Sequence, residues 1–233
     1  MSLILLLETY NNNCSVGISQ NGQLIYSVIN TDGKSHSAIL TGLIDESLRK
    51  TGLTVRQLDA VAVSKGPGSY TGLRIGVSTA KGICYGADRP LLAPDTLQYL
   101  AKAVSSATLQ DNDHFFCPMI DARRLEVYCA VYDASNRVVS PPEAVIISEN
   151  SFSEYSGNKK LVFFGDGAEK CKKVLSGNPN LIYINIEEYH VLSSMALTAH
   201  ELYMNQRFEN TAYFEPFYLK DFVAAAPKVK GLT

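Results

Sequence analysis

Residues 59–86 read DAVAVSKGPGSYTGLRIGVSTAKGICYG, and this stretch predicts a strand, a tight turn and a helix in succession. The short apolar run at 60–63 is typical of a buried strand. In the turn Gly66-Pro67-Gly68, the proline restricts φ and the two glycines allow positive φ. A serine or threonine at 69–71 can cap the helix that follows. The stretch therefore predicts a strand-turn-helix unit whose turn can hold an anion at the helix N-terminus.

The helix predicted from residue 69 onward has two different apolar faces. One is an ordinary core stripe at about 100° per residue, made of Leu73, Val77, Ala80 and Cys84. The other contains Gly72, Ile75, Gly76, Thr79, Gly82, Ile83 and Gly86. Because glycine costs about 0.5–1 kcal/mol relative to alanine inside a helix, four glycines require a reason. We expect another backbone to approach this face, and we favour a partner helix; the alternative is that one domain covers both faces.

A second helix, expected over residues 37–50 and ended by Gly52, is apolar over a wide arc. Its apolar residues, which span roughly 180° against the ~100° that one core requires, are Ile39, Leu40, Leu43, Ile44 and Leu48. One interpretation is a helix buried deeply in its own lobe. We favour a second interpretation, in which the two helices lie side by side and present one apolar surface to another subunit.

The order of elements repeats once along the chain. Strands expected at 2–8, 14–19 and 23–30 are matched by strands at 115–121, 126–132 and from 138 onward. Glu8 corresponds to Asp121 at an offset of 113 residues, and Asn21 in the hairpin turn Asn21-Gly22 corresponds to Ser135 at 114. Strand-and-helix units follow each set, with strands at 60–63, 90–93, 161–164 and 181–186 and helices from 69, from Asp95, from 168 to Leu175 and over 192–207.

This repeat predicts two α/β lobes with mixed sheets. We expect a first lobe over residues 1–105 and a second, smaller lobe over 106–190, with the boundary in the polar stretch 105–114. The helix at 192–207 is expected to pack back on the first lobe, followed by a tail at 208–233.

Composition indicates a folded protein, since 46% of the residues are hydrophobic and 19% are charged. A net charge of −2 without a dominant basic run argues against a stand-alone nucleic-acid binder. The five cysteines are widely spaced and lack a C-x-x-C pair, which favours reduced thiols in a cytoplasmic protein over disulfides or a zinc site. No apolar run approaches the ~20 residues of a membrane span, and Leu3–Leu7 is too short for a signal sequence.

The glycine-rich stretch and five further segments also resemble a known family. The segment Ser64–Gly76 is similar to the signature of the TsaB family, also called YeaZ, the non-catalytic subunits of the bacterial tRNA threonylcarbamoyladenosine machinery. The other segments, which fall in the expected order, are Ile4–Ile18, His36-Ser37, Asp121–Tyr128, Gly165–Ala168 and Pro216–Lys220. The resemblance spans almost the whole chain and implies two RNase H-like lobes of the sugar kinase, Hsp70 and actin superfold.

The resemblance further implies a scaffold subunit that binds the catalytic, metal-bearing paralogue TsaD. Together with the ATPase TsaE, that complex transfers a threonylcarbamoyl group to the adenosine next to the tRNA anticodon. The chain would touch tRNA only through the complex and would close a homodimer when alone. The expected interface residues are His36, Ile39, Leu40, Leu43, Ile44, Gly72, Ile75, Gly76, Thr79, Gly82 and Ile83. No cofactor is expected for the isolated chain. Whether a nucleotide binds at an interface that the chain shares with another subunit stays open.

The nucleotide site of this superfold supplies the main alternative, an ATP-binding small-molecule kinase or ATPase. The residues in corresponding places are Glu8, Thr9, Asp121, Gly165, Asp166 and Gly167. The first hairpin turn, residues 10–13, has neither a glycine nor a lysine to meet phosphate. We therefore do not expect a working nucleotide site in this chain alone.

The sequence gives little support to an enzyme that needs a metal or a nucleophile. The paralogue carries two histidines one helical turn apart, whereas the position four residues after His36 is Leu40. Around Ser69 a G-x-S-x-G elbow fails, because Pro67 stands where glycine is required. A glycoprotease-like peptidase is thus the least favoured function.

Overall fold

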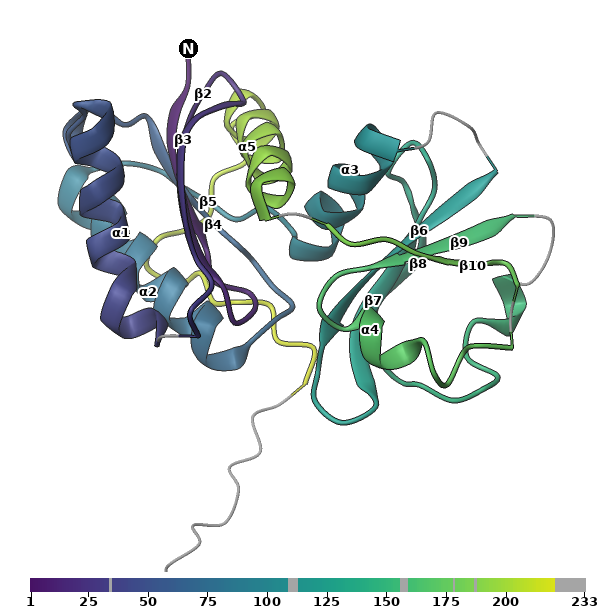
Figure 1. The fold of residues 1–233 in the computed structure, drawn as a ribbon. Coiled ribbons are helices and arrows are strands. Elements are labelled where there is room, and N and C mark those ends of the chain that lie inside the picture. The colour runs from purple at the N-terminus through teal and green to yellow at the C-terminus, as the bar shows by residue number, and fades with distance from the viewer. Residues whose placement is uncertain (34, 109–112, 156–158, 178, 187, 221–233) are drawn as a thin grey trace, which may run out of the picture.

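The computed structural model of the chain describes residues 1–220 except 34, 109–112, 156–158, 178 and 187, and these form two sheets flanked by helices (Figure 1). The first sheet contains β1 (Leu3–Glu8), β2 (Cys14–Gln20), β3 (Gln23–Asn30), β4 (Ala60–Val63) and β5 (Leu91–Leu92). The second contains β6 (His114–Asp121), β7 (Glu126–Tyr132), β8 (Val138–Ile146), β9 (Lys160–Phe164) and β10 (Leu181–Tyr183). The helices are α1 (His36–Thr51), α2 (Tyr70–Ala87), α3 (Thr96–Thr108), α4 (Ala168–Cys171) and α5 (Glu188–Met204), and two short 3₁₀ turns are η1 (Val55–Gln57) and η2 (Ser153–Tyr155).

The two sheets have the same topology. The strand order is β3-β2-β1-β4-β5 in the first and β8-β7-β6-β9-β10 in the second. In each, three antiparallel strands come first, and two further strands then add parallel to the first of them. Asn21 and Gly22 form the predicted hairpin turn, with φ of 50° and 79°. The two mixed-sheet lobes and their repeated order are therefore confirmed.

The central strands are buried on both faces because helices cover both sides of each lobe. In β1, Ile4 and Leu6 face one core while Leu5 and Leu7 face another. Helices α1 and α2 cover the outer face of the first sheet, and α5 packs on its inner face against β1 and β3 (Figure 1). Helix α3 packs against both α5 and β6, so one continuous core joins the two sheets.

Several boundaries differ from the sequence expectation. Strand β5 has only two residues, since prolines at 90 and 94 lack the N–H that a ladder needs. Strand β10 ends at Tyr183, and α4 ends at Cys171 instead of Leu175. Helix α5 covers 188–204 instead of 192–207, and α3 ends at Thr108, within the polar stretch 105–114 where the lobe boundary is expected. Residues 221–233 of the expected tail lie outside the described residues.

Candidate functional site

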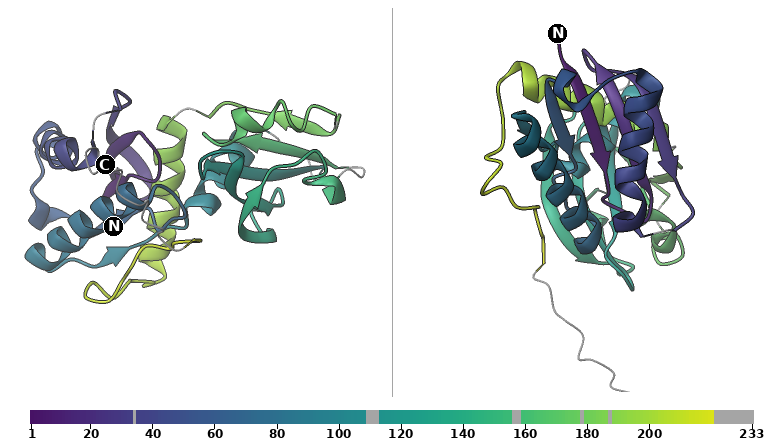
Figure 2. Two further views of the ribbon diagram at one scale, coloured as in Figure 1. Left: turned by 90° about the horizontal axis from the view of Figure 1, so that it is seen from below. Right: turned by 90° about the vertical axis from the view of Figure 1, so that its left-hand side faces the viewer.

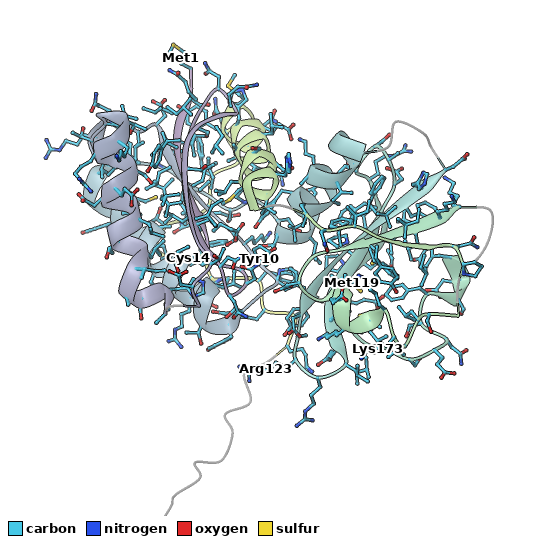
Figure 3. The ribbon with its side chains drawn as sticks, in the orientation of Figure 1. Met1, Tyr10, Cys14, Met119, Arg123 and Lys173 are labelled. Carbon is cyan, nitrogen blue, oxygen red and sulfur yellow. The ribbon has the colours of Figure 1, made fainter. Side chains whose placement is uncertain are left out.

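The two lobes enclose a cleft of about 480 Å³. The first lobe contributes the β1–β2 turn at 10–12 and residues 68–71, where the glycine-rich turn leads into α2. The second contributes residues 121–123 at the end of β6 and Asp166 after β9. Tyr10 and Arg123 lie on the two sides of this cleft (Figure 3). The cleft is therefore built at the carboxyl ends of equivalent strands in both lobes, where open α/β sheets bind ligands.

The glycine-rich turn before α2 is shaped by the chain's own backbone. Ser69 caps the helix, since its Oγ accepts a hydrogen bond from Gly72 N at 3.3 Å, and its own N–H donates to Tyr10 O at 2.6 Å. A Cβ atom on Gly68 would lie 2.5 Å from the same carbonyl oxygen. Gly66 has φ of 107°, which favours glycine. Gly68 is therefore required because the β1–β2 turn packs directly on it, and Gly66 is required by its φ and by the backbone of Phe217, whose carbonyl oxygen would lie 2.6 Å from an added Cβ.

Glu8 and Thr9 do not reach the cleft, which corrects their place among the candidate nucleotide residues. Both are fully buried. The Tyr99 hydroxyl donates to Glu8 Oε2, and Tyr10 N donates to Glu8 Oε1 at 3.0 Å. The hydroxyl oxygen of Thr9 has no hydrogen-bond partner in the described part of the chain and faces Gly76 of α2. Both side chains hold the first lobe together.

On the second lobe, Asp121 and Asp166 do line the cleft. Lys170 Nζ donates to Asp121 Oδ1, and Asp121 N donates to Asp166 Oδ1 at 3.0 Å. Gly165, with φ of 96°, and Gly167 instead pack against the backbone of β6. The candidate acid Asp121 is thus already neutralised by a lysine of its own lobe.

Residues 217–220 form a strap across the cleft. Phe217 N donates to a backbone carbonyl of the loop after β4 at 2.8 Å, and the Tyr218 ring packs on Tyr70 with 4.7 Å between centroids. Lys220 Nζ then pairs with both carboxylate oxygens of Glu126 on the second lobe, at 2.8 and 2.9 Å. Partial burial raises the pKa of Tyr218. The strap was not predicted from the sequence, where residues 208–233 were expected to form a tail, although Pro216–Lys220 is one of the segments that carry the family resemblance.

Helices α1 and α2 lie side by side on the outer face of the first lobe (Figure 2). His36 begins α1 and its Nε2 is hydrogen-bonded to Asn13 O at 2.9 Å, so it is anchored to its own lobe. Leu40 and Ile44 are buried in the core beneath the helix. Of the expected α1 interface residues, His36, Ile39 and Leu43 keep partial exposure.

The α2 glycines fall into two groups. Gly72 and Gly76 are buried, and a Cβ atom on either would overlap Thr9, so our expectation that a partner backbone explains them is wrong. At these two positions the alternative is correct: the face of α2 is covered by residues of its own lobe. Gly82 and Gly86, in contrast, have no atom within 4 Å of an added Cβ. The same holds for Gly42 on α1, while the α2 residues that stay half-exposed are Ile75, Thr79 and Ile83.

We define the outer helix surface as Ile39, Gly42, Leu43, Ile75, Thr79, Gly82, Ile83 and Gly86. It is the predicted partner surface without its four buried positions and without His36, whose ring is hydrogen-bonded to Asn13, and it adds the open glycines Gly42 and Gly86. Exposed glycines one turn apart on α2 let another backbone come close, as in tightly packed helix pairs.

The described residues contain no group of three or more histidine, cysteine, aspartate or glutamate side chains placed to hold a metal ion. Likewise, no helix in the described ranges is long and apolar enough to cross a membrane. All five cysteines are free and buried. Burial raises the pKa of Cys14, Cys84 and Cys171 to about 11.

Comparison with known sequences gives consistent matches. A family model described as "TsaD: tRNA N6-adenosine threonylcarbamoyltransferase" matches residues 27–228. The tRNA threonylcarbamoyladenosine biosynthesis protein TsaB of Haemophilus influenzae is 27% identical over 94% of this chain and 94% of its own length. The protein of the same name from Bacillus subtilis is 28% identical over 74% of each chain.

Solved structures show the same fold. YeaZ from Pseudomonas aeruginosa has a TM-score of 0.76 at 23% identity, covering 94% of this chain and 100% of that one. The ethanolamine utilization protein EutJ from Carboxydothermus hydrogenoformans has a TM-score of 0.52 at 11% identity, covering 85% and 90%. An activator of 2-hydroxyisocaproyl-CoA dehydratase from Clostridium difficile, solved with bound ADPNP, has a TM-score of 0.50 at 12% identity, covering 88% and 96%. The predicted two-lobed superfold is confirmed.

Proposed function

Because this chain belongs to the TsaD family, and within it to the TsaB (YeaZ) proteins of tRNA threonylcarbamoyladenosine biosynthesis, we propose that it serves that pathway as a non-catalytic subunit. It binds the catalytic paralogue TsaD and holds it in its active arrangement. The observation that carries the proposal is the outer helix surface, where three glycines on two adjacent helices stand open to another backbone.

Symmetry indicates which kind of partner fits the outer helix surface. A homodimer with a twofold axis uses the same patch on both copies, so the outer helix surface would meet itself in a four-helix contact. A paralogue built on the same plan can replace one of the two copies. The match of this chain to the TsaD model supports such an exchange. The homodimer is then the resting form, and the pair with TsaD is the working form.

Non-catalytic status is supported by the state of the residues in and beneath the interlobe cleft. Asp121 is paired with Lys170, Glu8 and Thr9 are buried, and the strap crosses between the lobes. The chemistry would reside on TsaD, and the ATPase TsaE would join the same complex. A net charge of −2 fits a subunit that meets tRNA only through that complex, and free buried thiols fit a cytoplasmic location.

An ATP-binding kinase or ATPase is the second candidate, favoured by the cleft itself, which lies at the carboxyl ends of equivalent strands. Turnover of ATP by the isolated chain, abolished by Asp121→Ala, would support it. Nucleotide at an interface shared with TsaD would instead require both chains for binding.

The test is reconstitution of the modification. Purified TsaD and TsaE from the same organism are incubated with tRNA and the threonylcarbamoyl donor, with and without this chain, and the modified adenosine is quantified by mass spectrometry. We expect product only when the chain is present, together with a stable complex with TsaD in size-exclusion chromatography with light scattering. Equal product without the chain, or no complex with TsaD, would overturn the proposal.

A further inference from the structure

A second cavity, of about 340 Å³, lies outside the carboxyl ends of two parallel strands of the first lobe. Lys65 follows β4 by two residues and Asp95 follows β5 by three, and both line it. The rest of the lining comes from Ala93, from Gln98 of α3, from helix α5 and from residues 207–209. The cavity therefore occupies a position where parallel sheets bind small ligands, and its volume is in the range of small-molecule sites.

The wall made by residues 207–209 is held in place by the sheet. Glu209 N donates to Leu91 O at 2.9 Å, and these two residues form an antiparallel bridge beside β5. The Phe208 ring packs edge-on against Tyr203 of α5, with 5.9 Å between centroids. The cavity is thus a pre-formed feature of the fold.

Four of the residues that line the cavity carry charged side chains, two of each sign. Lys65 and Arg207 are cationic, and Asp95 and Glu209 are anionic. Among the described residues, none of the four forms an ion pair within 4.0 Å. Opposite charges that surround one space without joining each other leave both signs available to a ligand.

We propose that this cavity binds a small zwitterion of the α-amino acid class. A phosphate or other dianion would be repelled by Asp95 and Glu209, and a metal cation by Lys65 and Arg207. A ligand that carries a carboxylate and an ammonium group satisfies both sets. Leu202 of α5 and Phe208 give the same cavity an apolar side, suited to an aliphatic or aromatic ligand side chain.

The environment of Asp95 agrees with this ligand. Its carboxylate caps α3 by accepting from Gln98 N at 3.2 Å. Burial nevertheless raises the pKa of Asp95, since this N–H and the charge of Lys65 only partly offset the lost hydration. A ligand ammonium group would supply the missing compensation.

The test titrates the full chain with each standard L-amino acid by isothermal calorimetry. We expect saturable binding of at least one at or below millimolar concentration. The N-acetyl and α-amide derivatives of that amino acid, which each lack one charge, should bind at least about tenfold more weakly. The proposal is overturned if no free amino acid binds, or if both derivatives bind as tightly as the free amino acid does.

Two variants connect the binding to this cavity. Arg207→Gln and Asp95→Asn should each weaken it by at least about tenfold, and Asn keeps the helix cap, so the fold is retained. Lys220→Gln, which changes only the interlobe cleft, is the control and should bind like the parent chain. Binding that survives both cavity variants would place the ligand elsewhere and refute the assignment.

Discussion

Three glycine-to-arginine variants separate the outer helix surface from the core. Gly76→Arg and Gly82→Arg make the same change on one helix, and Gly177→Arg makes it on the second lobe. An added Cβ meets no atom within 4 Å at Gly82 or at Gly177, whereas at Gly76 it would overlap Thr9. The same glycine-to-arginine change is made at all three positions, so the variants differ only in the surroundings that the new side chain meets.

The expected magnitudes follow from that difference. At Gly82 a good helix former replaces glycine, which gains about 0.5–1 kcal/mol and raises the melting temperature by about 1–4 °C. At Gly76 overpacking and burial of a charge cost about 4 kcal/mol or more, which lowers the melting temperature by about 8–16 °C. If Gly82 lies at the centre of an interface, the arginine there weakens association by roughly 2–4 kcal/mol, or about 30- to 1,000-fold.

Differential scanning fluorimetry gives the melting temperatures, and light scattering after size exclusion gives the mass alone and with TsaD. We expect Gly82→Arg to be a stable monomer that no longer binds TsaD, Gly76→Arg to be destabilised, and Gly177→Arg to match the parent chain. A Gly82→Arg protein that still dimerises and binds TsaD would show that the interface lies elsewhere. A Gly76→Arg protein that melts like the parent would refute the packing of α2 on Thr9.

Three further outcomes test individual contacts. Lys220→Gln removes the ion pair with Glu126 at the end of the strap, so chymotrypsin should cleave after Phe217 and Tyr218 faster while the melting temperature hardly changes; an unchanged cleavage rate would contradict the strap. Tyr99→Phe removes the hydroxyl donor of buried Glu8, which should cost about 1–3 kcal/mol and about 2–12 °C in melting temperature; an unaltered melting temperature would mean that this contact is dispensable. Burial raises the pKa of Cys84 from 9.0 to about 11, so its contribution to stability is complete below pH 9 and lost as the pH rises toward 11. Urea unfolding between pH 9 and 11 should show that the free energy of unfolding falls less for Cys84→Ala than for the parent chain. An equal fall in both proteins would contradict the raised pKa of Cys84.

The fold was largely predictable because its signals are local or periodic. The apolar run of β1, the hairpin turn at Asn21 and the helix cap at Ser69 each depend on residues within a few positions of one another. The repeat of strand order was visible because the same local signals recur at a nearly constant offset. The length of α4 was less predictable, since the ends of short elements depend on tertiary hydrogen bonds, whereas Pro90 and Pro94, which shorten β5, are visible in the sequence.

The candidate site was only partly predictable. Asp121 and Asp166 line the cleft as their positions after strands suggested, and α1 and α2 lie side by side. The roles of Glu8 and Gly76 were misjudged, because each depends on contacts with residues remote in sequence.

Sequence by itself determined which segments become strands and helices, that the plan occurs twice, and which family the chain resembles. Periodicity and backbone sterics decide these matters, and both act over a few residues. Only the tertiary structure decided which face of α2 is covered, that Lys220 carries the strap across to Glu126, and that four charged residues without an ion pair in the described part of the chain line one cavity. A helix pattern reports how apolar a face is but not what lies against it, because the covering residue can come from any other part of the chain.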